Sequence, residues 1–394
     1  MSERFDAVVV GAGPAGSAAA VTLARSGCRV LLLDRRSFPR DKPCGDLIGV
    51  RALRAALRLG VSETDLREYP RIAGAIVTTE GGELDLAPRS GWGQRLLSGS
   101  DARVVPRVVF DDLLVRSAVR AGATFRQATV RDVGPWASGA RVVSGQERHG
   151  ALSVAARAVV VAGGYGCRVA SDAAPDDRDE SPARGIAMRG YFRDVACPAD
   201  RIVFSLEPWL LPGYGWVFPL PGGRANVGVG RLATPNDEGG EETHLHELWQ
   251  RFIEDPRSPT AQWCRDAVPD GRPRAWPLDL GPRRRPLTAD GLLVAGEAAG
   301  LVGPLTGAGI AFALESGERA GWVIASALES GEATKDRLSP YGRETRRRAA
   351  PWLRAELLAQ RFLADAERAR RFFDVVRPLP PTGALGARLL LHLG

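Results

Sequence analysis

The 394-residue sequence is poor in lysine and methionine and has only five cysteines. No two cysteines form a Cys-x-x-Cys pair, which argues against a disulfide scaffold and against a cysteine zinc site. His244 and His246 stand in an acidic stretch that is more typical of a solvated helix than of a metal site, so no metal is expected. The sequence lacks any run of about 18 uncharged apolar residues, and its N-terminal apolar run is too short for a secretory signal. These absences favour a reducing compartment, and we expect a cytoplasmic protein.

Basic residues outnumber acidic ones by 53 to 46, and arginine carries the excess because the only lysines are Lys42 and Lys335. A net charge of +7 permits weak attraction to anionic surfaces, but it does not establish a nucleic-acid partner, and we expect none. With 44% hydrophobic and 25% charged residues, the composition is that of a globular protein with a sizeable core. No internal repeat is present, which excludes solenoids and propellers.

The opening of the chain has the pattern of a strand–turn–helix–strand unit. Residues 5–10 and 28–34 are continuous apolar runs, typical of parallel strands that are buried on both faces. Similar buried elements recur later, as a helix at 108–121 and as strands at 157–163 and 291–296. By contrast, residues 71–88 and 184–232 alternate polar and apolar side chains, which predicts antiparallel strands of a second layer.

A glycine-rich turn joins the first strand to the first helix. Its three glycines have the spacing of the dinucleotide fingerprint: the first allows a tight turn, the second lets a pyrophosphate approach, and the third lets helix pack on strand. The helix N-terminus offers free N–H groups to phosphates, and Asp34 ends the second strand where an acid binds ribose hydroxyls. The nucleotide-binding residues predicted here are Gly11, Gly13, Pro14, Ala15, Gly16, Asp34 and Arg35.

A second glycine-rich segment decides between NAD and FAD. Residues 296–300 (GEAAG) follow a buried strand, and residues 304–310 (PLTGAGI) open a helix. This segment resembles the second flavin-binding motif of Rossmann-type FAD oxidoreductases. The resemblance implies that Glu297, where most relatives carry Asp, holds the ribityl chain, and that N–H groups at the helix start face the flavin pyrimidine edge. It also implies an arginine that leads a helix beside the flavin. The residues so implied are Arg107, Gly296, Glu297, Gly307, Ala308, Gly309 and Ile310.

Two further motifs narrow the family. They are residues 41–46 (DKPCGD), soon after the ribose acid, and residues 212–219 (PGYGWVFP). Together with the flavin motifs they resemble the geranylgeranyl reductase family, within the p-hydroxybenzoate-hydroxylase-like flavoproteins, over roughly residues 1–325. The resemblance implies FAD-dependent reduction of isolated carbon–carbon double bonds in polyprenyl chains or related hydrophobic molecules. It implies that Cys44 and Gly45 border the flavin. It also implies that the substrate channel is lined by Tyr214, Trp216 and Phe218.

We therefore expect an α/β fold in which a Rossmann-type FAD-binding domain is interrupted by an antiparallel β-rich substrate domain and followed by a helical C-terminal region. The expected boundaries are 1–66, 101–175 and 276–330 for the FAD-binding domain, 67–100 and 176–275 for the substrate domain, and 331–394 for the C-terminal region. Within that last region, residues 336–376 are predicted to be helical, broken at Pro351, with their many arginines on a solvated face. The alternative is a membrane-surface helix, so we expect at most a peripheral membrane contact. The apolar stretch 384–393 is predicted to dock on the body or on another subunit.

The motifs leave the reaction open. A reductase needs a hydride from reduced flavin N5 and a proton that Cys44, Tyr214 or water supplies, whereas a monooxygenase uses the same fold with a flavin hydroperoxide. A halogenase needs a catalytic lysine apart from the flavin loop, which neither lysine provides. A flavoprotein that acts on a protein partner is a further alternative. Tyr165 stands where relatives have a polar or acidic residue, so the reductant is either NAD(P)H or a separate donor, such as a flavin reductase or a ferredoxin-like protein.

Overall fold

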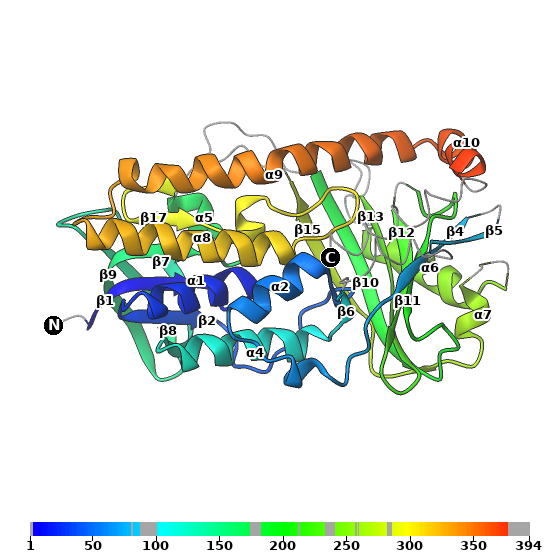
Figure 1. Cartoon of the computed structure of the whole chain (residues 1–394), viewed down its shortest axis with the longest axis horizontal. Helices are drawn as coiled ribbons and strands as arrows, with labels where there is room; N and C mark the ends of the chain where they lie inside the picture. The colour runs from blue at the N-terminus through cyan, green and yellow to red at the C-terminus, as the bar shows by residue number, and fades with distance from the viewer. Residues whose placement is uncertain are drawn as a thin grey trace.

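The computed structural model describes residues 3–79, 82–86, 101–173, 183–211, 213–232, 241–256, 258, 260–281 and 286–376. Figure 1 shows a helix-covered sheet on the left and a second sheet on the right, with the long helix α9 (Lys335–Leu363) above both. The architecture is the expected α/β fold. Among the described helices, none combines the length and the apolar character that crossing a bilayer requires.

The first sheet has seven strands and carries the carboxyl-terminal strand ends that open into the site. Its spatial order is β1 (Glu3–Val10), β2 (Val30–Asp34), β7 (Thr124–Val133), β8 (Arg141–Glu147), β9 (Gly150–Val161), β17 (Leu292–Val294) and β16 (Thr288–Ala289), and β1 also pairs with β9. The pairs β1–β2, β1–β9 and β9–β17 are parallel, as the buried apolar runs predict. The carboxyl ends of these four strands therefore meet at one edge of the sheet.

Helices cover this sheet and complete the βαβ unit that the glycine-rich turn predicts. They are α1 (Pro14–Arg25), α2 (Val50–Arg58), α4 (Arg107–Arg120), α5 (Arg168–Ala173) and α8 (Ile310–Glu329), with short 3₁₀ turns η1 (Thr64–Leu66) and η2 (Gly296–Ala299). The helix predicted at 108–121 is α4, and the helix predicted after the second glycine-rich segment is α8. All residues of α1 from Pro14 to Leu23 are buried, so this helix is covered on every side and not only where it faces the sheet.

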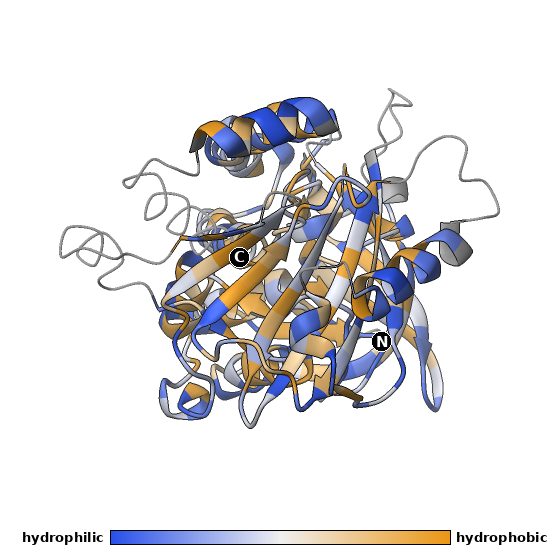
Figure 2. Cartoon of the chain, turned by 90° about the vertical axis from the view of Figure 1, so that its right-hand side faces the viewer, coloured by the Kyte–Doolittle hydropathy of each residue, from blue (hydrophilic) through white to orange (hydrophobic). Residues whose placement is uncertain are grey.

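The second sheet has eight strands. They are β14 (Val268–Pro269), β10 (Ala183–Arg193), β13 (Arg224–Leu232), β12 (Tyr214–Leu220), β11 (Arg201–Ser205), β4 (Gly74–Thr79) and β5 (Gly82–Asp85) in spatial order, with β15 (Arg274–Leu280) paired to β10. The helices α6 (Glu241–Glu254) and α7 (Ala261–Cys264) lie in this half, and β3 (Leu47–Ile48) pairs with β6 (Arg103–Val104) beside it. Figure 2 shows orange, white and blue segments along these strands, so hydrophobic and polar residues share them.

One pairing in this sheet differs from the expectation of antiparallel strands. β4 and β11 run parallel, whereas their neighbours pair antiparallel. The reason is connectivity: β4 and β11 are separated by an excursion of the chain through the first sheet, and only tight hairpins force neighbouring strands to be antiparallel. β15 spans the boundary proposed at residue 276.

The C-terminal helices also differ from expectation. The predicted break at Pro351 is wrong, because α9 is continuous through both Pro340 and Pro351 and is followed by α10 (Ala366–Val376). Proline removes one helical hydrogen bond, and packing on the body offsets this loss. Tyr341 is fully buried, and its hydroxyl donates to the carbonyl oxygen of Val294 at 2.7 Å. The stretch 384–393, predicted to dock, lies outside the described residues.

Candidate functional site

A cavity of about 590 Å³ lies between the two sheets, at the carboxyl ends of the parallel strands. It takes its walls from the first sheet, from β10, β12, β13 and β15 of the second sheet, and from the loop that precedes α8. Of the residues that the sequence predicts for the site, all line this cavity except Gly16 and Gly296, which are buried behind its surface. Motifs that are hundreds of residues apart in the chain therefore meet in one place.

The first glycine-rich turn forms a cradle that is open only at its middle glycine. Gly11 has φ +98°, and a side chain there would collide with the carbonyl oxygen of Ala162. A side chain at Gly16 would collide with the carbonyl oxygen of Gly11. At Gly13, by contrast, a Cβ atom would meet only a guanidinium nitrogen of Arg40, 3.6 Å away. The free space beside Gly13, at the N-terminus of α1, has the form that a pyrophosphate needs.

Asp34 and Arg40 complete this end of the cavity. One carboxylate oxygen of Asp34 accepts from the N–H of Ala12 at 2.9 Å and the other from the N–H of Arg36 at 2.9 Å, which ties this carboxylate to the glycine turn. Arg40 places a cation beside Gly13 and is itself held by Asp111, 3.0 Å away. Arg40 was not predicted as a site residue, although its position directly before the DKPCGD motif could have indicated it. Its position suits a phosphate partner.

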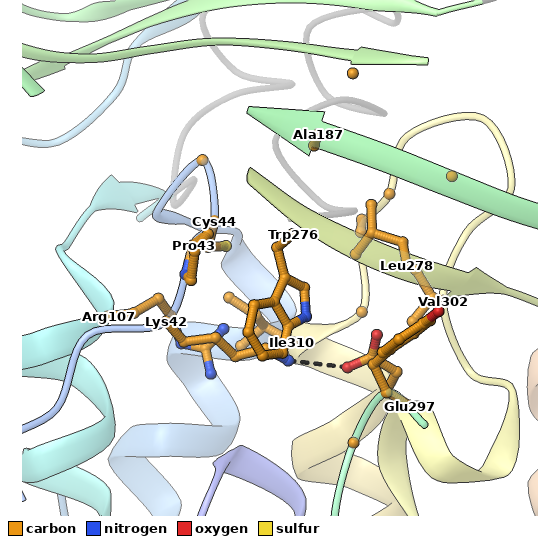
Figure 3. A pocket seen from close by; sticks show the side chains of 18 of the residues that line it. Lys42, Pro43, Cys44, Arg107, Ala187, Trp276, Leu278, Glu297, Val302 and Ile310 are labelled. Carbon is orange, nitrogen blue, oxygen red and sulfur yellow. Dashed lines mark hydrogen bonds and ion pairs between the residues drawn. The ribbon is translucent and has the colours of Figure 1, made fainter. Parts of the chain in front are cut away.

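Glu297 lines the cavity, and only one of its two carboxylate oxygens has a hydrogen-bond partner among the described residues. Figure 3 shows its carboxylate facing Lys42, whose Nζ lies 2.9 Å from Oε2, with Trp276 beside the pair. The other oxygen, Oε1, is buried and has no hydrogen-bond partner among the described residues, and the same is true of Trp276 Nε1. A buried polar atom without a partner is costly, so these atoms fit a ligand that brings its own hydroxyl groups. The ribityl chain of FAD has this chemistry.

The Cys44 loop packs directly against the aromatic strand β12. A Cβ atom at Gly45 would lie 2.9 Å from Phe218 Cε2 and 3.5 Å from Trp216 Nε1, so only glycine permits this approach. Alternation along the strand puts Tyr214, Trp216 and Phe218 on one face, with successive ring centroids 5.9 and 6.3 Å apart. The cysteine loop and the aromatic wall therefore border the same space.

A buried hydrogen-bond network joins the loop to the second sheet. Trp216 Nε1 donates to Asn226 Oδ1 at 2.9 Å, and Asn226 Nδ2 donates to the carbonyl oxygen of Cys44 and to Asp46 Oδ2, both at 2.7 Å. Asp46 also accepts from the Tyr191 hydroxyl at 2.6 Å and from the N–H of Arg107 at 3.1 Å. Burial raises the pKa of Asp46 to about 6, although these donors oppose the rise. Sequence analysis assigned none of Asp46, Tyr191 and Asn226 to the site, since the last two lie on separate strands without a local signal.

Arg107 and Tyr214 both lie near Cys44 in the cavity wall. Arg107 begins α4 and forms a two-bond ion pair with Asp111 at 2.6 and 2.7 Å. Burial lowers the pKa of Arg107, but Asp111 and the neighbouring Cys44 side chain more than offset this and raise it above its ordinary value. The Tyr214 hydroxyl donates to the carbonyl oxygen of Thr306, and burial raises the pKa of this phenol.

Comparisons with known proteins agree with this geometry. Residues 4–183 match the family model of the FAD binding domain. A menaquinone reductase from Mycobacterium tuberculosis is 33% identical over 343 residues, which are 83% of this chain and 78% of that protein. Digeranylgeranylglycerophospholipid reductase 2 from Methanopyrus kandleri is 32% identical over 352 residues, 86% of this chain and 81% of that protein.

Solved structures show the same fold. A geranylgeranyl bacteriochlorophyll reductase-like protein from Thermoplasma acidophilum has a TM-score of 0.82 at 24% identity, covering 98% of this chain and 96% of that one. A flavin-dependent brominase has a TM-score of 0.74 at 20% identity, covering 99% and 94%. The cradle, the half-satisfied Glu297 and these matches agree on FAD as the cofactor. The chain belongs to the geranylgeranyl reductase family of FAD-dependent oxidoreductases, within the p-hydroxybenzoate-hydroxylase-like flavoproteins.

Proposed function

We propose that this enzyme reduces a carbon–carbon double bond in a polyprenyl-like hydrophobic molecule. The observation that carries the proposal is the aromatic wall of Tyr214, Trp216 and Phe218, which borders the same cavity as the FAD cradle and faces the Cys44 loop. An unactivated olefin has no polar group to bind, so it must be held by apolar surface. The geranylgeranyl group named in several relatives is an unsaturated polyprenyl chain, which supports the same substrate class.

The cofactor supplies a hydride at N5 of reduced FAD when bound, and the chain supplies the pocket and the proton. With that hydride for one carbon of the double bond, the chain would supply the proton for the neighbouring carbon, so that the double bond would become a single bond. The aromatic wall excludes water from this step. We propose that these three aromatic residues orient the olefin and that Cys44 is the catalytic residue that gives the proton.

Cys44 is better placed for this role than Tyr214. The Tyr214 hydroxyl is engaged with the carbonyl oxygen of Thr306, and burial disfavours loss of its proton. The Cys44 side chain instead lies beside the Arg107 guanidinium. Once Cys44 has given its proton to the olefin, its sulfur lies next to a fixed cation. Reprotonation from solvent then restores the thiol.

The partners and the location follow from the same features. We propose that the enzyme is reduced by NAD(P)H, by a separate flavin reductase or by a ferredoxin-like donor. We also propose that the enzyme contacts a membrane at most peripherally when it takes up its substrate. All five cysteines are free thiols, which supports a location in the reducing cytoplasm. We also propose that the predicted flavin-binding residues contact FAD in the way that the family motifs imply.

The test compares two samples of enzyme whose flavin has been reduced anaerobically. The FAD-loaded protein is photoreduced without any protein donor, then mixed in one sample with geranylgeraniol alone and in the other with geranylgeraniol and oxygen, and flavin absorbance and product mass are followed. We expect geranylgeraniol to reoxidise the flavin and to gain two hydrogen atoms. A product that gains an oxygen atom, formed only when oxygen is present, would establish the monooxygenase alternative instead. No reaction of geranylgeraniol or of shorter polyprenols would overturn the proposed reduction.

A further inference from the structure

Residues 303–309, here named the flavin loop, lie between η2 and α8. Residues 304–309 of this loop line the cavity, whereas Gly303 does not. The N–H groups at the start of α8 have no partner within the helix, so they are available to a ligand. The resemblance of residues 296–310 to the second flavin-binding motif implies that this helix start faces the flavin pyrimidine edge, where the reduced cofactor carries negative charge. The position of the flavin loop therefore decides how well these N–H dipoles are aimed.

A carboxylate from the C-terminal helix holds this loop from behind. Glu356 of α9 is only 5% exposed, and its Oε2 accepts from the N–H groups of Leu305 and Thr306, each at 3.1 Å. The Thr306 hydroxyl lies 3.0 Å from the same oxygen, and Trp352 Nε1 donates to Oε1 at 2.8 Å. Every one of these donors is a fixed group of the loop or of α9. Glu356 thus has the contacts of a loop anchor, not those of a residue on a solvated face.

Neighbouring contacts strengthen the same attachment. Gln360, one turn farther along α9 and also 5% exposed, donates to the carbonyl oxygen of Pro304. A side chain at Gly303 would collide with the Glu356 carboxylate, so glycine there permits the close approach. From the opposite side, Tyr214 of the aromatic strand donates to the carbonyl oxygen of Thr306. The flavin loop is therefore clamped between the C-terminal helix and the substrate wall.

We propose that Glu356 is a positioning residue for FAD chemistry: it fixes the flavin loop so that the N–H groups at the start of α8 stabilise the reduced cofactor. Fixed dipoles stabilise a charge more than mobile ones do, because they need no reorganisation when the charge appears. Loss of Glu356 should therefore weaken the binding of reduced FAD more than that of oxidised FAD. Because the two affinities set the potential, the midpoint potential should become more negative.

A direct electrostatic role of the carboxylate predicts the opposite sign. If Glu356 acted mainly as a nearby negative charge, its removal would favour the anionic reduced cofactor and make the potential more positive. The sign of the shift therefore separates positioning from charge. A merely structural role would lower thermal stability and leave the potential unchanged.

The experiment compares E356Q with T306V and with the control E344Q. Gln at 356 keeps the shape but lacks the second acceptor oxygen. T306V keeps the charge and removes a hydroxyl that donates to Glu356 and accepts from the N–H of Ala308 within the loop. E344Q removes a carboxylate of the same helix that accepts from Arg347 and Arg348, away from the loop. The readouts are the FAD dissociation constant, the midpoint potential and the unfolding temperature of each purified protein.

We expect E356Q to bind FAD at least about tenfold more weakly, since a buried amide left unpaired costs on the order of such a factor. We expect a more negative potential in both E356Q and T306V, and no change in E344Q. A positive shift in E356Q with no shift in T306V would overturn the proposal in favour of a charge effect. An unchanged potential in both would also overturn it. If E356Q does not fold, T306V alone decides by the same criterion. None of these readouts uses an olefin, so they stand independently of the proposed reduction.

Discussion

Asp46 offers a sharp test of the buried network that joins the Cys44 loop to the second sheet. Its carboxyl group is fully buried and accepts hydrogen bonds from Tyr191, Asn226 and the backbone of Arg107. Burial raises its pKa from 3.8 to about 6, against the opposing effects of the Tyr191 and Asn226 hydrogen bonds and the Arg189 charge. The folded state therefore holds this proton more tightly than the unfolded state.

The sign and size of the consequence follow from linkage. Because the folded pKa is raised, the contribution of Asp46 to stability is present in full below about pH 3.8 and is lost as the pH rises to about 6. A shift of about two pKa units corresponds to about 3 kcal/mol of unfolding free energy. Replacing Asp46 by Asn removes this titration. Any misfit of the Asn amide with its donors adds a penalty that does not depend on pH.

The assay is urea unfolding of the wild type, D46N and the control D132N, which removes an exposed carboxylate, at several values between pH 4 and 8. Relative to the wild type, D46N should gain about 2.5 kcal/mol between pH 4 and pH 7, whatever its offset at pH 4, because part of the full effect is already lost at pH 4, just above the unfolded pKa of 3.8. Y191F removes a donor to the ionised form, so the fall in its stability should extend to higher pH. Parallel profiles for wild type and D46N would refute the raised pKa and with it the desolvated network.

Four further variants test the site itself. In G13V the space beside α1 is filled without a backbone collision, so the apoprotein should keep its unfolding temperature and lose FAD binding. G16V should unfold instead, because its side chain collides with the backbone. Retained FAD in G13V would contradict the placement of the pyrophosphate. W216A should lower olefin turnover by about an order of magnitude or more while dithionite reduction and FAD content persist, with the exposed W322A as control; equal turnover would show that Trp216 serves packing alone. C44S should slow olefin reduction about 100-fold at unchanged FAD affinity, whereas C28S should not slow it, and the mass of the product checks the reaction. A C44S enzyme as fast as the wild type would show that water, and not Cys44, gives the proton. E297Q should weaken FAD binding about tenfold in a fluorescence titration, because a charged acceptor is lost, and an unchanged dissociation constant would exclude a ribityl contact.

The parts of the site that lie next to one another in the chain were predictable. The first glycine-rich turn, with Asp34 at the end of the next strand, needs only local geometry, and the structure forms it as expected. The flavin cofactor and the family were predictable because the segments at 41–46 and 296–310 are contiguous motifs. The roles of the individual residues remain predictions until the variants above are measured.

The parts that depend on partners from other elements were not predictable. Lys42 was considered only as part of a loop motif, yet it forms an ion pair with Glu297, 255 residues away. Asn226 looked like an ordinary strand residue, and it bridges Trp216 to the Cys44 loop. The arginines of α9 drew attention to its solvated face, while its buried face carries Glu356. A hydrogen-bond partner is a property of the folded neighbourhood, which no local pattern contains.

The sequence by itself determined the chemistry that the chain can host, because glycine spacing, strand ends and helix starts are local features that fix where a dinucleotide can bind. Only the tertiary structure decided how that chemistry is held. Folding brings the carboxyl ends of four parallel strands to one edge and sets the aromatic strand against Gly45. It also brings α9, which has the sequence pattern of a charged tail, back to the flavin loop. These contacts form by long-range packing, because buried apolar contacts and hydrogen bonds stabilise the folded state regardless of how far apart their residues are along the chain.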